Sequence, residues 1–526
     1  MAQGPNVAEE RAFPDKSRRW FIAMAVALGA MLEIVDTSIV NVALTQMQAS
    51  LGATLSEIGW VITSYAIANV IILPLSAWLG ERFGQKRFWV FSLVAFIVAS
   101  MMCGFSHTLP QLVIARVLQG LFGGGLLAKA QSILFETFPK EEQPAAQALF
   151  GVVAISGPAI GPTLGGWIVT NFDWRWIFFI NLPIGIVAVM MSAASLLPDR
   201  KRDIIKARVD WWSLALLAIG LGTLQTLLEE GYAEGWFESR FIVTMTVTAA
   251  ISLVWFARRQ LATDTPVVDL RVLRYRSLAA GCLVSLVIGM GLYGAMFSVP
   301  IFAQTVLHFT AQQTGMLMLP GALASAFSMI IVSRLLRRFD PRMLIACGAL
   351  IVVSSMVTLS RITPLTGPEH LFWPLIIRGF GTVMMFLPMS MAALGAIPVK
   401  DVGKGTGLYN LTRQLGGSLS IAILTTMLSS RQAFHRGVLI EKVSATDPQV
   451  LGRIQAMTTA FIAKGFDAIE AKRKAIFLLD ATVSVQALVL SFGDTFTMTA
   501  FVFIGILPLL FLLGGKSKAP ASGGAH

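Results

Sequence analysis

The chain has 526 residues, of which 55% are hydrophobic and 13% are Asp, Glu, Lys or Arg; an ordinary soluble protein carries about 25% of these charged residues. Such a composition, with a mean hydropathy of +0.71, excludes an intrinsically disordered chain and a set of soluble domains. Three cysteines in apolar runs are too few for a disulfide scaffold. The net charge of +12 comes from basic residues that flank apolar segments, which indicates a membrane protein rather than a nucleic-acid-binding one.

Fourteen apolar segments are long enough to cross a bilayer as helices. The first has a basic prefix but no cleavage site, so we expect a retained helix rather than a signal peptide. The sequence therefore predicts an all-α integral membrane protein with fourteen transmembrane helices. Their approximate limits are 20–45, 58–79, 88–105, 110–136, 146–170, 175–197, 212–230, 241–257, 278–305, 313–334, 342–361, 371–397, 404–430 and 493–514.

The basic residues are distributed unevenly between the predicted loops. One set of alternate loops is rich in Lys and Arg, whereas the short loops of the other set hold only Arg175, Arg240 and Arg361. The positive-inside rule makes the basic loops cytoplasmic, and an even number of spans then places both termini in the cytoplasm. The charged segment 431–492 falls on the opposite side, and its charge spacing predicts that part of it is an amphipathic helix.

The order of the spans divides the chain into three parts. Residues 1–198 form a predicted six-helix bundle, 199–277 an inserted two-helix hairpin with basic flanks, and 278–526 a second six-helix bundle. The two bundles resemble repeats, because Arg116 and Arg378 occupy similar places in the fourth helix of each. Duplicated six-helix halves with a substrate path between them are common in secondary transporters.

Two acidic residues, Glu33 and Asp36, lie deep within a predicted span. Carboxylates at this depth are costly and usually functional. Their spacing puts both on one side of the first helix, and helix geometry allows Asp36 to reach the depth of Arg116. A carboxylate whose burial opposes ionisation and whose arginine favours it can switch its protonation. The alternatives are a polar seam between helices or a permanent ion pair that only fixes them together.

Two other basic residues lie within predicted spans but close to the cytoplasmic surface. We expect Lys129 to extend its amine to that surface and Arg413 to anchor the beginning of its helix there. The sequence contains no phosphate-binding loop and no H-E-x-x-H pattern, and its five histidines lie in loops or the tail. We therefore predict no catalytic residue, no cofactor and no metal ion; the protein is expected to be a transporter and not an enzyme.

Glycines recur every fourth residue in the fifth span, at Gly157, Gly161 and Gly165. Such a ridge lets two helix backbones approach closely. Together with Pro162 and Gly166, these glycines form the most specific pattern in the chain.

Several motifs resemble those of the major facilitator superfamily, in its fourteen-helix drug:proton antiporter branch of the EmrB/QacA type. Residues 32–44 are similar to the first-helix motif, with Val35 and Thr45 replacing the usual Leu and Pro, and residues 174–185 are typical of the branch. In the loop after the second helix, Ala77 replaces a Gly and Glu81 replaces an Asp.

This resemblance implies roles for three groups of residues, and it extends over nearly the whole chain. It links Asp36 and Arg116 to proton coupling, whereas Glu33 is a candidate through its depth alone, and the choice between the two carboxylates is left open. The fifth-helix pattern is characteristic of antiporters, and the cytoplasmic loop is implied to latch the two halves. The antiporter motif comprises Gly157, Gly161, Pro162, Gly165 and Gly166, and the latch comprises Glu81, Arg82, Gly84 and Lys86.

The resemblance implies a multi-pass protein of a bacterial inner membrane that exports lipophilic compounds in exchange for protons. Segment 431–492 implies a periplasmic adaptor protein and an outer-membrane channel as partners, besides membrane lipids. The alternatives are a dedicated exporter of one metabolite, fatty acid or lipid, an uptake symporter, and a non-transporting scaffold or sensor. The charge of the substrate is left open. Candidate cavity residues are Tyr65, Asn69, Gln119, Tyr293, Met385 and Phe386.

Overall fold

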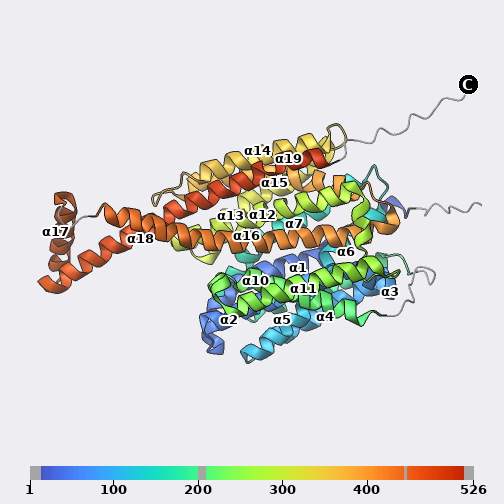
Figure 1. Ribbon diagram of the computed structural model, residues 1–526, viewed down its shortest axis with the longest axis horizontal. Helices are drawn as coiled ribbons and strands as arrows, with labels where there is room; N and C mark the ends of the chain where they lie inside the picture. Colours follow the sequence, from blue (N-terminus) through green and yellow to red (C-terminus); the bar gives the residue numbers. More distant parts are fainter. Residues whose placement is uncertain (1–12, 200–208, 444–446, 514–526) are drawn as a thin grey trace, which may run out of the picture.

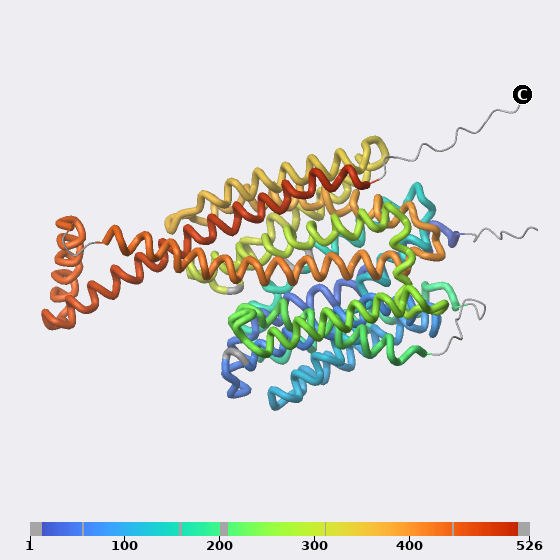
Figure 2. The backbone as a smooth tube through the Cα atoms, in the orientation of Figure 1, coloured from blue at the N-terminus to red at the C-terminus, as the bar shows by residue number. Residues whose placement is uncertain are grey.

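A computed structural model of the chain describes residues 13–199, 209–443 and 447–513. Within these ranges the secondary structure is entirely helical, and most helices run along the long axis of the molecule (Figure 1). The beginning of α1 and the short α19 lie at the end of the molecule opposite α17 (Figure 2). Basic residues of the predicted cytoplasmic loop at 200–208 and of the tail at 514–526 lie outside the described residues.

Residues 13–199, the first described range, form nine helices. In it α1 packs against α7 and α9, and α2 packs against α5. The bounds are α1 (Lys16–Leu51), α2 (Leu55–Ile72), α3 (Ser76–Phe83), α4 (Gln85–Gly104), α5 (Leu109–Gly123), α6 (Leu126–Thr137), α7 (Gln143–Asn171), α8 (Trp176–Phe179) and α9 (Asn181–Ser195).

The described residues after 208 hold ten more α-helices. Here α12 packs along α16, and α14 packs along α15. The bounds are α10 (Trp211–Glu230), α11 (Arg240–Ala262), α12 (Arg276–Thr305), α13 (Ala311–Leu335), α14 (Pro341–Leu359), α15 (Pro368–Leu394), α16 (Val399–Glu441), α17 (Pro448–Ala463), α18 (Ala468–Ile504) and α19 (Ile506–Leu509), with 3₁₀ turns at Trp236–Glu238, Leu270–Arg274 and Leu510–Leu512.

Two predicted spans are interrupted in the structure. The span expected at 58–79 is bent by 58° between α2 and α3, next to Pro74, which has no backbone N–H to donate. The span expected at 110–136 is divided into α5 and α6 at Gly124 and Gly125, residues with low helix propensity. The second break leaves the first N–H groups of α6 without partners from their own helix.

Twelve helices or joined helices in the described residues are long and apolar enough to cross a membrane, and the bent α2–α3 pair adds a thirteenth. The chain is thus a multi-pass membrane protein. The predicted count of fourteen is not confirmed, because α16, which contains the expected span 404–430, is not among these helices. Its middle carries polar residues, including Asn410, Arg413 and Gln414.

The glycine-rich helix α7 lies between α1 and α13. A Cβ at Gly165 would be 3.2 Å from the carbonyl oxygen of Ile39 on α1, and a Cβ at Gly161 would be 3.0 Å from the amide nitrogen of the same residue. On the side of α13, a Cβ at Gly166 would be 3.1 Å from the amide nitrogen of Gln312. The ridge therefore replaces side chains by direct contact between backbones.

The hairpin formed by α10 and α11 is joined to helices from both large groups. Thr63 on α2 donates a hydrogen bond to Glu230 on α10 at 3.0 Å. Gln225 on α10 donates to Ser418 on α16 at 2.8 Å, and the indole of Trp236 donates to Thr426 of α16 at 2.9 Å. Through these bonds α10 bridges α2 and α16.

A helical arm extends beyond the other helices, formed by α17, the end of α16 and the beginning of α18 (Figure 1). It corresponds to the segment 431–492, for which only partial helix was expected. Arg436 of α16 donates to Asp480 of α18 at 2.7 Å, and His435 lies 2.8 Å from Asp494. Ion pairs between α16 and α18 thus support the arm where it leaves the bundle.

Candidate functional site

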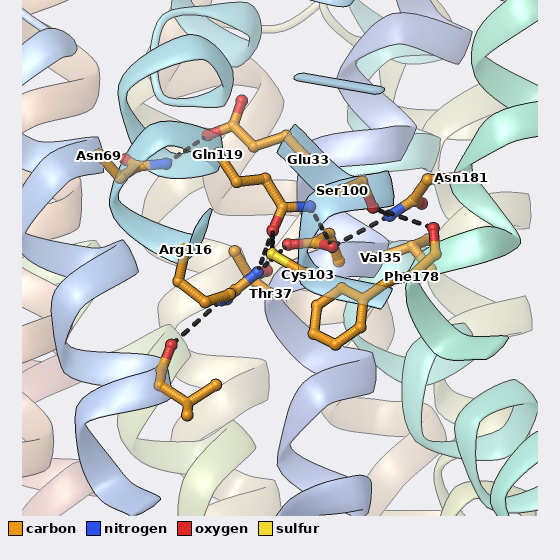
Figure 3. Close-up of polar contacts among 12 residues, drawn as sticks. Glu33, Val35, Thr37, Asn69, Ser100, Cys103, Arg116, Gln119, Phe178 and Asn181 are labelled. Atoms are coloured by element: carbon orange, nitrogen blue, oxygen red, sulfur yellow. Dashed lines mark hydrogen bonds and ion pairs between the residues drawn. The ribbon is translucent and has the colours of Figure 1, made fainter. Parts of the chain in front are cut away.

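A buried hydrogen-bonded cluster surrounds Asp36 of α1, and Figure 3 shows its members Arg116, Gln119 and Asn181. The Asp36 carboxylate accepts from Arg116 Nη1 at 2.6 Å, from Gln119 Nε2 at 2.8 Å and from Asn181 Nδ2 at 3.0 Å. None of these four side chains is more than 1% exposed. The carboxylate is therefore held by one charged donor and two neutral ones, without contact with the surface of the protein.

Arg116 is held from several directions. Its Nη1 also donates to Gln119 Oε1 at 2.7 Å, and its Nε donates to the carbonyl oxygen of Val61 at 3.1 Å. The guanidinium lies 4.1 Å from the ring centre of Tyr65, where a cation interacts favourably with the aromatic face. The guanidinium thus has other acceptors besides Asp36 when the charge of that carboxylate changes.

The cluster assembles because three helix segments present polar groups at the same depth. Arg116 and Gln119 are three residues apart on α5, so they share one face of that helix. Asn181 is the first residue of α9, and its amide also donates to Ser100 Oγ at 3.0 Å. The Ser100 hydroxyl in turn donates to the carbonyl oxygen of Phe178. The polar chain therefore continues from α1 and α5 to α4 and α9.

Glu33, one turn before Asp36, is bound in a different way. Its carboxylate accepts from Asn69 Nδ2 of α2 and from the backbone N–H of Leu127, both at 2.9 Å. Leu127 is the second residue of α6, whose N–H groups are free because α5 ends at the Gly124–Gly125 break. A carboxylate at this position also interacts favourably with the helix dipole. The negative charge of Glu33 is thus compensated by the N-terminal end of α6, and that of Asp36 by Arg116.

Three members of the Asp36 cluster were not expected from the sequence: Asn181, Ser100 and Cys103. Asn181 lies in a segment that is typical of the antiporter branch, and it is a polar residue in an apolar stretch. A search of the apolar spans for amide side chains, in addition to charged ones, would have found Asn181. Cys103 lies 3.4 Å from Gln119 Oε1, and nothing in its apolar surroundings in the sequence indicates that contact.

The structure places the six predicted cavity residues on helices of both large groups, namely α2, α5, α12 and α15. Tyr65, Asn69 and Gln119 belong to the cluster around Asp36 and Glu33. Tyr293 donates to Gln414 of α16 at 3.2 Å. Met385 and Phe386 are buried at neighbouring positions of α15 but in different apolar clusters. A surface pocket of about 570 Å³ is elsewhere, between Phe309 of the α12–α13 loop and Trp373 of α15.

Two interpretations of basic residues were wrong. Lys129 was expected to reach the cytoplasmic surface, but it is 3% exposed and its amine packs over Gly80 of α3. Arg413 was expected to anchor a helix end, but α16 begins four turns earlier, at Val399, and the side chain is 5% exposed. Lys129 is covered by α3, and Arg413 lies deeper because α16 begins at Val399, before the predicted limit of 404.

The predicted latch residues surround the beginning of α4. The carboxylate of Asp199 accepts from the backbone N–H groups of Lys86 and Arg87, at 2.9 and 3.0 Å, and the Lys86 amine donates to the carbonyl oxygen of Leu196. Gly84 has a φ of +96°, and a Cβ there would collide with Asp199. This part of the loop thus holds α4 to the end of α9.

The other two latch residues lie on α3. Arg82 packs over the ring of Trp78 at 5.5 Å, and the charge of Glu81 interacts with that of Lys404 on α16. Glu81 thus lies near α16, which belongs to the second large group of helices. Among the described residues, no group of three His, Cys, Asp or Glu is arranged to hold a metal ion.

Comparison with known proteins agrees with this architecture. Residues 26–421 match the Major Facilitator Superfamily, which is most of the chain. The chain belongs to the major facilitator superfamily. Members of this superfamily are transporters rather than enzymes, so the polar cluster lies in a transport protein.

Within the superfamily, the similar proteins cover nearly the whole chain. The multidrug export protein EmrB of Escherichia coli K12 is 32% identical over 96% of this chain and 97% of its own length. The fatty acid resistance protein FarB of Neisseria gonorrhoeae is 27% identical over 96% of this chain and 98% of its own length. The predicted resemblance to EmrB-like drug efflux transporters is confirmed.

A solved structure shows the same fold with little sequence similarity. The human organic anion transporter MFSD10 is 13% identical, with a TM-score of 0.59 over 94% of this chain and 100% of its own. This likeness supports the helical arrangement of the superfamily for the present chain.

Proposed function

We propose that this protein is a proton-driven antiporter that exports lipophilic compounds from the cytoplasm or the inner leaflet across a bacterial inner membrane. The observation that carries the proposal is the buried pair of Asp36 and Arg116, on helices α1 and α5. The similarity to EmrB of Escherichia coli supports multidrug export as the direction and breadth of transport.

The cluster can perform coupling because its arginine has alternative acceptors. When Asp36 takes up a proton it loses its charge, and Arg116 keeps hydrogen bonds to Gln119 Oε1 and to the Val61 carbonyl oxygen. When the proton leaves, the ion pair forms again. One proton that crosses 100 mV supplies about 2.3 kcal/mol, which is enough to concentrate a substrate by about fiftyfold. Glu33 is the second candidate for this carrier.

In this proposal the substrate passes between the halves 1–198 and 278–526, with 199–277 as an inserted hairpin. We propose fourteen spans with both termini in the cytoplasm. This count requires α16 to cross the membrane, and its packing along α12 over much of its length supports such a crossing. The helical arm would then face the periplasm. An adaptor protein and an outer-membrane channel are the partners that we propose for it.

A second candidate is a dedicated exporter of fatty acids or related lipids. The similarity to the fatty acid resistance protein FarB favours it. The two candidates differ in breadth of substrate and share the coupling step, so both depend on Asp36.

Transport by the purified protein in proteoliposomes tests the proposal. An imposed pH gradient should drive uphill movement of several unrelated lipophilic compounds, and a protonophore should abolish it. Export restricted to fatty acids would favour the second candidate. Transport that does not depend on the pH gradient would contradict proton coupling. The absence of transport for every lipophile tested would contradict both candidates.

A further inference from the structure

A second buried polar cluster joins the two large groups of helices, away from Asp36. Asn410 on α16 donates from Nδ2 to Gln131 Oε1 on α6 at 2.8 Å. Arg413, one turn along α16, donates from Nη2 to Asn410 Oδ1 at 2.8 Å. Gln147 of α7 donates to the backbone carbonyl oxygen of Gln131 at 3.3 Å. All four side chains are at most 5% exposed, so α6, α7 and α16 meet at one enclosed polar cluster.

The cluster is incompletely satisfied. Arg413 Nε and Gln131 Nε2 are buried and have no hydrogen-bond partner, and Gln147 Oε1 is also unpartnered. Burying a donor without an acceptor is unfavourable, and native proteins rarely leave several such atoms together. Two of the three free atoms are donors, and one of them belongs to a guanidinium. What the cluster lacks is mainly an acceptor, preferably a negatively charged one.

The charge of Arg413 is not neutralised by direct contact with an acid. Among the described residues its hydrogen bond goes to an amide oxygen, and its guanidinium lies 5.3 Å from the ring centre of Phe386. Glu33 is near enough for its charge to interact with that of Arg413. Both carboxylate oxygens of Glu33, however, are used by Asn69 and Leu127. This arrangement contrasts with Arg116, whose charge is paired with Asp36.

Apolar side chains lie beside these donors. The ring of Phe386 is 2% exposed, and its Cε1 would be 3.7 Å from a Cβ at Gly151. Met329 of α13 and Met384 of α15 belong to the same apolar cluster as Phe386. Methionine side chains adapt their shape to varied apolar partners. A ligand with its head group at Arg413 would thus have its apolar body against aromatic and thioether surface.

We propose that Arg413, Gln131 and Asn410 form the head-group site for a lipophilic organic anion, such as a carboxylate attached to an aromatic body. The inference rests on the proposed export function and adds the charge of the substrate to it. Arg413 Nε and Gln131 Nε2 would donate to the anionic oxygens, and Phe386 would contact the apolar body. Because this site lies between α6, α7 and α16, the anion would touch both halves of the transporter at once.

Binding to the purified full-length protein tests this site without any gradient. Three probes share a naphthyl body and differ in charge: 1-naphthylacetate, 1-naphthylacetamide and 1-naphthylmethyl-trimethylammonium. We expect the acetate to bind about tenfold more tightly than the amide, the effect of a charge-assisted hydrogen bond. Equal binding of the three, tighter binding of the cation, or no binding of the acetate would overturn the proposal.

Three variants distinguish recognition from structural support. Arg413→Gln should weaken binding of the acetate by about tenfold and leave binding of the amide unchanged. Arg413→Lys should retain a preference for the anion. Arg378→Gln is the matched control, because Arg378 is also buried on the same half and donates to the carbonyl oxygen of Ala295; it should keep the preference. Equal weakening of acetate and amide by Arg413→Gln would make Arg413 a support for the fold, which contradicts the proposal.

The failure of this inference can be told apart from failure of the export function. Anion binding that depends on Arg413, in a protein that shows no gradient-driven transport, would remove the export function and leave the site. Gradient-driven export with a preference for cations would support the export function and contradict the anion site. If Arg413→Gln does not fold, the ratio of acetate to amide binding in Arg413→Lys and in the wild type still decides the matter.

Discussion

The carboxylate of Asp36 and the guanidinium of Arg116 form an ion pair, with 2.6 Å between Oδ2 and Nη1, in which neither side chain is more than 1% exposed. Removing one partner of such a buried pair typically destabilises a protein by about 3–5 kcal/mol. Variants that probe coupling must therefore preserve shape and hydrogen bonding while they remove titration.

Asp36→Asn meets this requirement, because asparagine keeps the size of the side chain and one carbonyl oxygen for Arg116. We expect the variant to bind substrate, to release no proton when substrate is added, and to lose gradient-driven export. Proton release from detergent-purified protein and uphill transport in liposomes measure the two effects. Glu33→Gln is the comparison, and we expect it to retain at least part of the coupling.

The opposite result has a clear meaning. Full proton release and uphill transport by Asp36→Asn, combined with their loss in Glu33→Gln, would assign the proton to Glu33. That outcome would make the start of α6 the element that responds to protonation, because Leu127 donates to Glu33.

Gly161→Ala tests the contact between α7 and α1. Even a single Cβ at Gly161 would overlap Ser38 and lie 3.0 Å from the Ile39 amide nitrogen, and overpacking of this kind typically costs about 1–3 kcal/mol. We expect a folded protein with a lower unfolding temperature and strongly reduced transport. Gly59→Ala is the control, because no heavy atom lies within 4 Å of its Cβ position. Normal transport by Gly161→Ala would show that close contact between these helices is not needed.

Shortening the helical arm separates transport from partner binding. Arg436 pairs with Asp480, so replacing residues 442–474 by a short Gly-Ser linker should leave this ion pair and the packing of α16 on α18 in place. We expect proteoliposome transport to be retained and drug resistance of cells to be lost. Full resistance in cells would mean that the arm contacts no essential partner.

The pairing of Asp210 with Arg259 gives a prediction about pH. Hydrogen bonds from Arg259, at 2.9 and 3.1 Å, and from Ser213 lower the pKa of Asp210 to about 2, from its usual 3.8. Since the pKa is lowered in the folded state, the pair stabilises the hairpin fully above about pH 4, and this stabilisation is lost as the pH falls towards 2.

The unfolding temperature of Asp210→Asn should accordingly be lower than that of the wild type at pH 5, and the difference should vanish towards pH 2. Arg258→Gln removes a neighbouring exposed charge that forms no ion pair with the residues that the structure describes, so its unfolding temperature should follow the wild-type pH profile. A difference for Asp210→Asn that stays constant over this range would exclude the ion pair as its cause.

Much of the fold was predictable because membrane crossing imposes long apolar helices. The limits of the helices were less predictable, since apolarity alone does not register a polar helix such as α16 or a break such as Gly124–Gly125. The extension of α16 to Glu441 and the start of α18 at Ala468 lie in charged sequence. Their mutual packing stabilises these extensions, and a search for apolar segments does not detect it.

The site was predictable where a charge lies in an apolar span, as for Asp36, Glu33 and Arg116. It was not predictable where the partner is neutral or a backbone group. Asn181 and the Leu127 N–H are donors of this kind, and their positions depend on where helices begin in three dimensions. Arg413 was misread for a related reason, because the true start of its helix decides how deeply it is buried.

The bridge that α10 forms between α2 and α16 has a consequence for how molecules reach the interior from the bilayer. Thr63 with Glu230, and Gln225 with Ser418, close the seam between these two helices by polar contacts, and Gly222 packs near Ile67 and Ile71. On this flank the α10–α11 hairpin covers the contact between α2 and α16, which lipid tails would otherwise reach. A lipophile dissolved in the membrane therefore cannot pass between α2 and α16 on this flank unless the hairpin moves away.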